Sequence, residues 1–227
     1  MISFVPHMSM DTVIFDMDGL IIDSEPLWYE AAQESFKVFD ISISEDAYNT
    51  TTGLRTPEFL EHWFRVFDID RKHLVKTETD ILERLIYKIN TKGNMMRGVV
   101  RTIDFFAEKN FKIGLASSSP FSIINAVIDK LQLNNHFSAI ASAESLDYGK
   151  PHPQVFLDCA KALQSDPATC ICIEDSFNGL IAAKAAKMKC IIVPHPSQFE
   201  MERWNIADLK LSSLDALQEE NISGLIQ

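Results

Sequence analysis

Two pairs of carboxylates each stand directly after a short apolar run of the sequence. Asp16 and Asp18 follow the first run, with Gly19 behind them, and Glu174 and Asp175 follow a later one. If the first run is a strand, carboxylates two residues apart point to the same side, and the glycine permits a sharp turn. Carboxylates this close repel each other unless a divalent cation binds them or one keeps a proton. The pairs therefore indicate a metal site or acid–base chemistry; the local alternative is two turns or helix caps.

Hydroxyl groups and a lysine follow two other apolar runs. Ser117, Ser118 and Ser119 end one of them, and hydroxyl and backbone N–H groups at a strand end can bind a phosphate oxygen. Lys150 lies between a glycine and a proline, which places it in a defined loop. Each segment also has a purely structural interpretation, because serines often cap the next helix and surface lysines are usually solvated. Only their shared position after apolar runs links them to the carboxylates.

The segments that must position these residues alternate between two patterns. Short, continuous apolar runs are typical of strands buried on both faces, and apolar residues at helical spacing lie between them. The strand-like runs occupy residues 12–15, 111–115, 137–140, 170–173 and 190–193. Such alternation predicts an α/β fold with a doubly wound, Rossmann-like parallel sheet. Ligands of these sheets bind at the carboxyl ends of the strands, so we expect the polar residues to converge there.

One long stretch breaks this alternation, since residues 25–93 contain no convincing strand. Thr56, followed by a proline, is typical of a helix start, and a long stripe of apolar residues at helical spacing comes later. Asp70 is expected to cap that long helix or a short one before it. We therefore expect an all-helical cap at 25–93, inserted into an α/β core formed by residues 1–24 and 94–227.

Composition limits the partners and the compartment. The 32 acidic residues outnumber the 21 basic ones, which gives a net charge of −11 and argues against nucleic acid or an anionic membrane as a partner. The four cysteines form no metal-binding pair and are expected to be free thiols in a reducing compartment. Neither a secretory signal nor an apolar span is visible, so we expect a cytoplasmic protein, and a monomer.

Four short motifs together carry a resemblance to a known family. In sequence order they are Phe15-Asp16-Met17-Asp18-Gly19, Ser117, Lys150-Pro151 and Glu174-Asp175. They resemble the four motifs of the haloacid dehalogenase (HAD) superfamily, and the resemblance extends roughly from residue 11 to residue 194. The helical insertion is similar to the cap of the sugar-phosphatase and phosphomutase branch. The resemblance implies an enzyme that transfers the phosphoryl group of a small phosphorylated metabolite.

The resemblance also implies a catalytic role for several side chains. Asp16 matches the nucleophile that attacks phosphorus and becomes an aspartyl phosphate. Asp18 matches the general acid that protonates the leaving alkoxide and then, as a base, activates water. Ser117 and Ser118 would bind phosphate oxygens, and Lys150 would neutralise the phosphate charge. The dehalogenases of the superfamily lack an acid at the position of Asp18, so a phosphate ester is the better substrate class.

A magnesium site is part of the same resemblance. Asp16, Glu174 and Asp175 would contribute carboxylate oxygens, and Asp18 would contribute its backbone carbonyl. Mg²⁺ prefers such hard oxygen ligands and completes its octahedron with water and a phosphate oxygen.

The first motif loop and the cap are expected to choose the substrate. The segments 19–28 and 52–55 are similar to hexose- and hexitol-phosphate phosphatases, including 2-deoxyglucose-6-phosphate phosphatases. The residues expected on the substrate and cap side are Ser24, Glu25, Trp28, Gly53 and Arg55. Arg55 is the candidate cation for a distal group of the substrate, although a surface arginine at a helix start is the simple alternative. Trp28 is expected mainly to pack the cap, with its face partly at the pocket.

Three alternatives to a sugar phosphatase stay open. A β-phosphoglucomutase uses the same phosphoaspartate, but it carries a histidine at the position of Trp28, and this departure disfavours the mutase. The second alternative is a phosphatase for another small metabolite, of the phosphoglycolate, glycerol phosphate or nucleotide type. A catalytically silent binding protein is disfavoured because all four motifs are intact.

Overall fold

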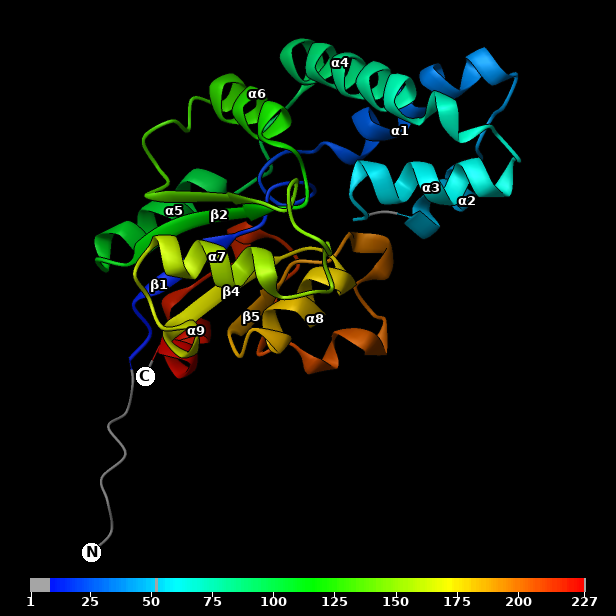
Figure 1. The fold of residues 1–227 in the computed structure, drawn as a ribbon. Coiled ribbons are helices and arrows are strands. Elements are labelled where there is room, and N and C mark those ends of the chain that lie inside the picture. The colour runs from blue at the N-terminus through cyan, green and yellow to red at the C-terminus, as the bar shows by residue number, and fades with distance from the viewer. Residues whose placement is uncertain (1–8, 52, 227) are drawn as a thin grey trace, which may run out of the picture.

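A parallel sheet of six strands lies at the centre of the molecule (Figure 1). The computed structural model describes residues 9–51 and 53–226, so Thr52 of the 52–55 segment lies outside the described residues. The strand order is β3-β2-β1-β4-β5-β6, and every neighbouring pair is parallel. The strands are β1 (Thr12–Phe15), β2 (Lys112–Ser117), β3 (Ala139–Ser142), β4 (Cys170–Glu174), β5 (Lys189–Ile192) and β6 (Leu209–Lys210). The predicted α/β class is confirmed.

The register of the three central strands sets the position of the polar residues. On β1, Phe15 lies opposite Leu115 of β2 and Ile173 of β4. The next residue of each strand therefore stands at the same level, and Asp16 follows β1 directly beside Glu174 at the end of β4. All four residues of β1 are buried, because helices cover both faces of a parallel sheet.

Helices of the core cover the two faces of the sheet in separate layers. Alternate residues of a strand point to opposite faces. Accordingly, Val13 and Phe15 share one apolar cluster with α5, α6 and α9, whereas Ile14 shares another with α7 and α8. The core helices are α5 (Val99–Glu108), α6 (Phe121–Leu131), α7 (Gln154–Ala162), α8 (Phe177–Ala185) and α9 (Glu219–Ile226).

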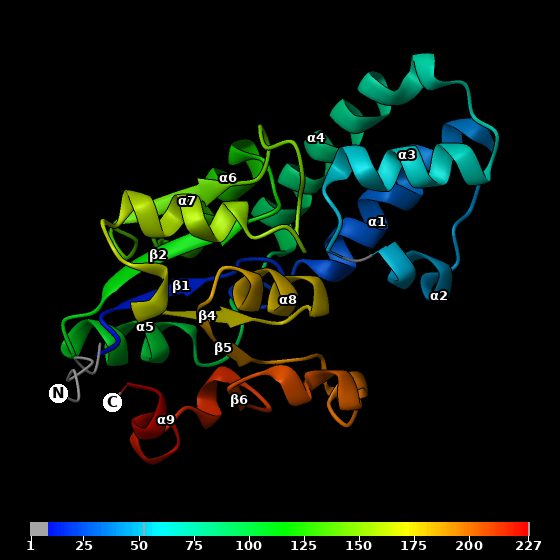
Figure 2. The same cartoon turned by 60° about the horizontal axis from the view of Figure 1, so that its bottom comes forward.

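Four helices between β1 and β2 form a separate lobe beyond the carboxyl edge of the sheet (Figure 2). They are α1 (Glu25–Phe36), α2 (Glu45–Tyr48), α3 (Thr56–Val66) and α4 (Leu74–Lys92). Phe36 lies at the centre of this lobe, in edge-on contact with Phe39, Phe59 and Phe64. The insertion is all-helical in the part of it that the structure describes, as predicted, and α4 also packs on α6 of the core.

Several local features differ from the sequence expectations. Strand β6 has two residues and was not predicted, because a pattern of alternation cannot be read from so short an edge strand. Thr56 is the first residue of α3 instead of its cap; Arg55 precedes the helix in an extended conformation. Asp70 caps the short 3₁₀ turn before α4, which is the second of its two predicted positions. The 3₁₀ turns span Lys37–Phe39, Asn49–Thr51, Arg71–His73, Pro167–Thr169, Pro196–Gln198, Glu202–Ile206 and Leu214–Ala216.

Candidate active site

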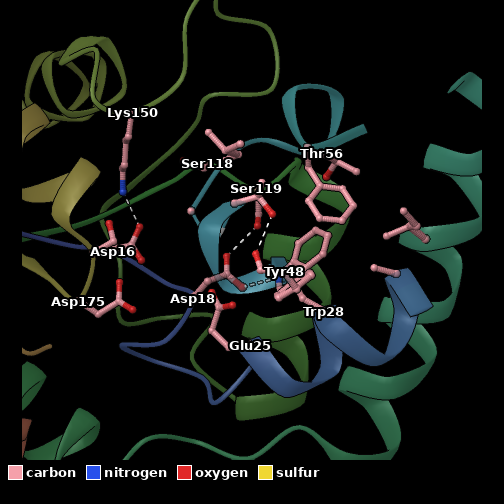
Figure 3. A pocket seen from close by; sticks show the side chains of 17 residues that line it. Asp16, Asp18, Glu25, Trp28, Tyr48, Thr56, Ser118, Ser119, Lys150 and Asp175 are labelled. Atoms are coloured by element: carbon pink, nitrogen blue, oxygen red, sulfur yellow. Dashed lines mark hydrogen bonds and ion pairs between the residues drawn. The ribbon is translucent and has the colours of Figure 1, made fainter. Parts of the chain in front are cut away.

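A pocket opens between the carboxyl edge of the sheet and the helical lobe (Figure 3). Its walls combine strand-end residues of the core with residues of α1, α2 and α3. The sequence-predicted site residues that line it are Asp16, Asp18, Glu25, Trp28, Gly53, Ser118, Lys150 and Asp175. Ser24, Ser117 and Glu174 lie directly behind them and contact them through hydrogen bonds. The predicted residues thus converge, with Arg55 as the exception.

Lys150 is the electrostatic centre of the core side. Its ammonium group donates to Asp16 Oδ1 at 2.5 Å, to Glu174 Oε1 at 2.7 Å and to the carbonyl of Ala116 at 3.2 Å. All three charged side chains are buried. Burial raises the pKa of Asp16 to about 8 even though Lys150 opposes the shift, and Glu174 and Asp18 add to it. Burial alone lowers the pKa of Lys150, but Asp16 and Glu174 together raise it above its ordinary range.

The acidic side chains next to Lys150 could hold a metal ion. One carboxylate oxygen from each of Asp16, Glu174 and Asp175 lies within 4.8 Å of the others. Burial raises the pKa of Asp175, and the charges of Glu174 and Asp16 raise it further. Asp16 and Glu174 are buried and Asp175 is half-buried, and the three carboxylates lie beside a single lysine, so a divalent cation would supply the positive charge that they lack. The donor set therefore fits a hard cation such as Mg²⁺.

The three carboxylates are not equally available to a cation. Glu174 Oε2 already accepts the backbone N–H groups of Asp175 and Ser176 and the Ser176 hydroxyl, each at 3.0 Å. Asp175 accepts no side-chain hydrogen bond from the residues described here, and it approaches the turn at Gly19 closely. A Cβ at Gly19, whose φ is +74°, would lie 2.2 Å from Asp175 Oδ2. Asp16 and Asp175 are therefore the more accessible ligands, and Glu174 mainly orients Lys150 and its own loop.

Asp18 is held by donors from both sides of the pocket. Ser24 Oγ and Trp28 Nε1 donate to Oδ1 at 2.6 and 3.0 Å, from the start of α1. Ser119 Oγ donates to Oδ2 at 2.7 Å, and Ser117 Oγ lies 3.4 Å from the same oxygen. This carboxylate therefore joins the helical lobe to the loop after β2. Trp28, expected mainly to pack, has a direct polar contact with the predicted acid–base.

The serine loop after β2 divides its hydroxyls between two tasks. Ser117 Oγ accepts the backbone N–H of Ser119 at 3.0 Å, so it is engaged within the loop. Ser118 lines the pocket, and its buried hydroxyl has no hydrogen-bond partner among the described residues. A buried hydroxyl without a partner is costly unless a ligand completes it. Ser118 is thus the better placed of the two predicted phosphate-binding serines.

The opposite wall of the pocket is aromatic and weakly polar. Trp28, Tyr48 and Phe59 contribute rings, and Glu25 contributes a carboxyl group. Burial, and then the charges of Asp18 and of other nearby acids, raise the pKa of Glu25 to about 7. The Glu25 carboxyl forms no hydrogen bond with the part of the chain that the structure describes. It can therefore pair with hydroxyl groups of a ligand.

Sequence reasoning assigned no individual role to several residues that line this pocket, among them Ser119 and Tyr48. Ser119 was one of three adjacent serines, and nothing in the sequence distinguishes the one that reaches Asp18. Tyr48 comes from α2, a helix too short to produce a periodic signal. Arg55 was expected here but does not line the pocket; its guanidinium group binds Glu58 and a core loop instead.

The fold and the site together define a parallel α/β domain with a helical insertion and a carboxylate-rich centre at the sheet edge. The chain belongs to the haloacid dehalogenase-like hydrolase family, whose family model matches residues 10–187. The resemblance inferred from the four motifs is confirmed. In the part of the chain that is described, no helix has both the length and the apolar character needed to cross a membrane.

Individual relatives place the chain within this family. It is 39% identical to hexitol phosphatase B of Escherichia coli (strain K12) over 212 residues, 93% of this chain and 96% of that protein. It is 32% identical to the β-phosphoglucomutase of Bacillus subtilis (strain 168) over 188 residues, 79% of this chain and 81% of that one. The crystal structure of β-phosphoglucomutase from Clostridium difficile matches with a TM-score of 0.84 and 26% identity, covering 95% of this chain and 96% of that one.

Proposed function

We propose that this chain is a Mg²⁺-dependent phosphatase that hydrolyses monophosphates of hexoses or hexitols. The observation that carries the proposal is the pairing of a lysine-bound Asp16 with an Asp18 that donors of both lobes hold at the pocket. Similarity to hexitol phosphatase B supports the substrate class. In this proposal residues 25–93 are the cap, and residues 1–24 and 94–227 are the catalytic core.

Asp16 is the nucleophile of the proposed reaction. Lys150 opposes the rise that burial causes in the pKa of Asp16, and a cation bound beside it would favour the ionised, nucleophilic carboxylate further. A carboxylate oxygen of Asp16 attacks phosphorus, the bond from phosphorus to the ester oxygen breaks, and an aspartyl phosphate forms. Lys150 and the free hydroxyl of Ser118 stabilise the negative charge on the non-bridging oxygens.

Asp18 carries the proton in both half-reactions. As an acid it gives a proton to the leaving alkoxide, and as a base it then takes one from the water that hydrolyses the aspartyl phosphate. Ser24 and Trp28 donate to one of its oxygens, which fixes the direction of the carboxyl group. Because these donors come from the start of α1, the position of Asp18 depends on that of the helical lobe.

The metal would be held by Asp16 and Asp175, with Glu174 next to them and the Asp18 backbone carbonyl as a further ligand. When bound, Mg²⁺ neutralises charge on the transferring phosphoryl group.

The distal part of the pocket favours a monophosphate. Among the described residues that line it, Lys150 is the only cation, and Asp16 and Glu174 already bind it. A second phosphate would meet Glu25 and aromatic rings, and burying an unpaired dianion there is costly. The hydroxyl groups of a hexitol could instead pair with Glu25 and Tyr48. The same argument disfavours the phosphomutase, which must turn a sugar bisphosphate in this pocket.

A substrate panel tests the proposal. We would measure phosphate release with Mg²⁺ from sorbitol 6-phosphate, 2-deoxyglucose 6-phosphate, mannose 6-phosphate and phosphoglycolate. β-Glucose 1-phosphate would be assayed with and without the 1,6-bisphosphate, following glucose 6-phosphate as well. We expect fast release from the hexose and hexitol 6-phosphates. Formation of glucose 6-phosphate with little free phosphate would establish the mutase instead, and a preference for phosphoglycolate would correct the substrate class.

The nucleophile is tested by Asp16→Asn, which keeps the shape of the side chain and removes the attacking oxygen. We expect turnover to fall to background while the circular dichroism spectrum is unchanged. Asp104→Asn, an exposed acid on α5, is the matched control and should retain full activity. Appreciable hydrolysis by the Asp16→Asn protein contradicts the phosphoaspartate mechanism.

A further inference from the structure

Arg55 commits its whole guanidinium group to contacts within the protein. The group has five N–H donors. Nε and one N–H of Nη2 donate to Glu58 Oε1, at 3.0 and 2.6 Å. Nη1 donates to the carbonyls of Ala143 and Leu146, and Nη2 also donates to the carbonyl of Asp147 at 3.2 Å. All five donors are used, so none is left for a substrate.

The three carbonyls belong to one loop of the core. It follows β3 and ends at Lys150, the residue that binds Asp16. Arg55 lies at the start of α3 in the helical lobe. A single side chain therefore connects the helical lobe to the segment that carries the catalytic cation.

Glu58 completes the connection from the first turn of α3. Its Oε2 accepts the backbone N–H of Arg55 at 3.1 Å, which fixes the start of the helix. Its Oε1 accepts the Arg55 side chain and lies 3.4 Å from the backbone nitrogen of Gly149. The pair thus reaches the loop both at its carbonyls and at the residue immediately before Lys150.

Gly149 provides an independent indication that the loop is built around Arg55. A Cβ at this position would lie 2.9 Å from Arg55 Nε and 3.1 Å from its Cγ and Cδ. Because Gly149 has no side chain, the aliphatic part of Arg55 can pack directly against the loop. The Arg55 side chain is only 12% exposed, so these hydrogen bonds are shielded from water.

The same loop also supports the serine loop of the site. Ser142 Oγ donates to the carbonyl of Ser119 at 2.7 Å, and the backbone N–H of Ala143 donates to the carbonyl of Ser117 at 2.9 Å. A shift of the segment after β3 would therefore move groups on both sides of the proposed phosphate position: Lys150 on one side and the serines on the other.

We propose that Arg55 and Glu58 form a clamp by which the helical lobe fixes the loop carrying Lys150, and that Arg55 is a positioning residue instead of a substrate contact. The inference rests on the proposed phosphatase activity for its kinetic consequence. When the lobe is docked, the loop carbonyls are paired and Lys150 is held against Asp16. When the lobe moves away from the core, these carbonyls lose the Arg55 donors and accept hydrogen bonds from water instead. The loop is then no longer held in place by the lobe.

The kinetic test compares a long and a short substrate in Arg55→Gln. We would measure kcat and KM for sorbitol 6-phosphate and for phenyl phosphate, which has no polyol. The clamp predicts that kcat falls about 10- to 100-fold for both, with little change in KM, because displaced catalytic groups cost rate at the chemical step. Arg65→Gln, an exposed arginine on the same helix, is the control and should be unchanged.

Two kinetic outcomes would overturn the inference. If KM rises for sorbitol 6-phosphate alone, Arg55 contacts the distal end of the substrate. If Arg55→Gln has wild-type kinetics on both substrates, the clamp has no influence on Lys150.

Gly149→Ala separates the clamp from a general loss of folding. The added methyl group displaces the Arg55 stem while its charge is retained. We expect a lower kcat, and in a double-mutant cycle with Arg55→Gln the two effects on kcat should be clearly less than multiplicative. Multiplicative effects would mean that the two residues act independently, which contradicts the clamp.

Hydrogen exchange gives a readout that needs no turnover. In the wild-type protein the amides of residues 143–149 should exchange slowly, and in Arg55→Gln they should exchange faster while those of β1 stay protected. Unchanged protection would overturn the clamp even in an active enzyme. If the wild type releases no phosphate from any substrate, the proposed function fails, and the exchange data still decide whether the clamp exists.

Discussion

Asp18 takes its hydrogen bonds from residues that are distant from one another in the sequence and belong to different parts of the fold. Ser24 and Trp28 belong to the entry into the helical lobe, and Ser119 belongs to the loop after β2. An indole N–H can only donate, so Trp28 orients the carboxyl group without exchanging protons with it. In the proposed reaction the two residues therefore have separate roles: Asp18 transfers the proton, and Trp28 fixes the direction of its carboxyl group.

Trp28→Phe tests this division at the level of one hydrogen bond. A smaller aromatic ring is kept and the N–H donor is lost, and a net hydrogen bond contributes about 1 kcal/mol. We therefore expect kcat to fall about fivefold on hexitol phosphates, measured with saturating Mg²⁺. Trp204 does not line the pocket, and Trp204→Phe, which removes an indole donor to the Gln198 carbonyl, should leave kcat unchanged. Equal kcat values for Trp28→Phe and wild type would show that the contact does not matter for the reaction.

Glu25 should make stability depend on pH. Its folded pKa of about 7 exceeds the ordinary value of 4.5, so the folded protein binds this proton more tightly than the unfolded chain. Its contribution to stability is complete below about pH 4.5 and decreases as pH rises to about 7. Glu25→Gln removes this dependence. Relative to wild type, the variant should gain about 2–3 kcal/mol of unfolding free energy between pH 5 and pH 8.

The measurement is urea unfolding of both proteins at the two pH values, with EDTA present. Glu45→Gln, an exposed acid at the start of α2, is the control and should follow the wild type at both. A difference between Glu25→Gln and wild type that does not change with pH would mean that Glu25 is ionised throughout this range.

The helices of the lobe are held together mainly by aromatic rings. Phe36 of α1 contacts Phe59 and Phe64 of α3, and edge-on pairs of this kind add to the stabilisation from burial. Lys88 of α4 binds Glu30 and Glu34 of α1 and connects the two helices along one side. Phe36 therefore makes its ring contacts within the lobe, although the lobe and one face of the sheet share one apolar cluster.

Phe36→Ala should therefore weaken the lobe before it weakens the sheet. Removing a buried phenylalanine costs about 3–5 kcal/mol. We expect hydrogen exchange to accelerate in α1, α3 and α4 while the amides of β1 remain protected. Activity should also fall, because the lobe forms one wall of the pocket. Val75→Ala, on the exposed side of α4, should alter neither property. Equal loss of protection in the lobe and the sheet would show that they unfold as one unit.

The molecule as a whole repels the substrate that we propose for it. A net charge of −11 and a phosphate ester have the same sign. Attraction must come from local groups, and among the described pocket residues Lys150 is the cation that faces the core side. With three carboxylates around it, the site itself lacks positive charge until a metal binds. Metal binding and substrate binding should consequently depend on each other.

Mg²⁺ should stabilise the whole protein through this site. At a concentration of about 100 times its Kd, a ligand of the folded state adds about 2.7 kcal/mol, which appears as a higher Tm. Asp175→Asn should abolish this shift and the activity. In EDTA the same variant should be more stable than wild type, because a half-buried carboxylate next to the negative charges of Glu174 and Asp16 is removed.

The comparison is made by thermal unfolding with Mg²⁺ and with EDTA. Asp104→Asn serves again as the control, and it should keep the metal-dependent shift. If Asp175→Asn responds to Mg²⁺ as the wild type does, the metal is bound elsewhere.

The sequence by itself determined which polar residues stand at the ends of which strands. Buried strands leave a side chain only two directions, and parallel pairing puts their carboxyl ends at one edge. Asp16, Lys150 and Asp175 could therefore be expected together from apolar runs and motif order. The same reasoning predicted five of the six strands to within about two residues, and missed β6 because its two residues carry no pattern.

Only the tertiary structure decided which partners are contacted by long side chains and by side chains that could either pack or form hydrogen bonds. Arg55 has several rotatable bonds and five donors, so its partners depend on which acceptors the folded chain brings near. Trp28 could pack or donate, and the docking of α1 beside Asp18 made it a donor. Three adjacent serines are equivalent in sequence and differ once the loop after β2 is folded. The local sequence pattern predicts where each strand or helix lies along the chain. Which side chains of distant segments bind each other depends on how those segments pack in the folded protein.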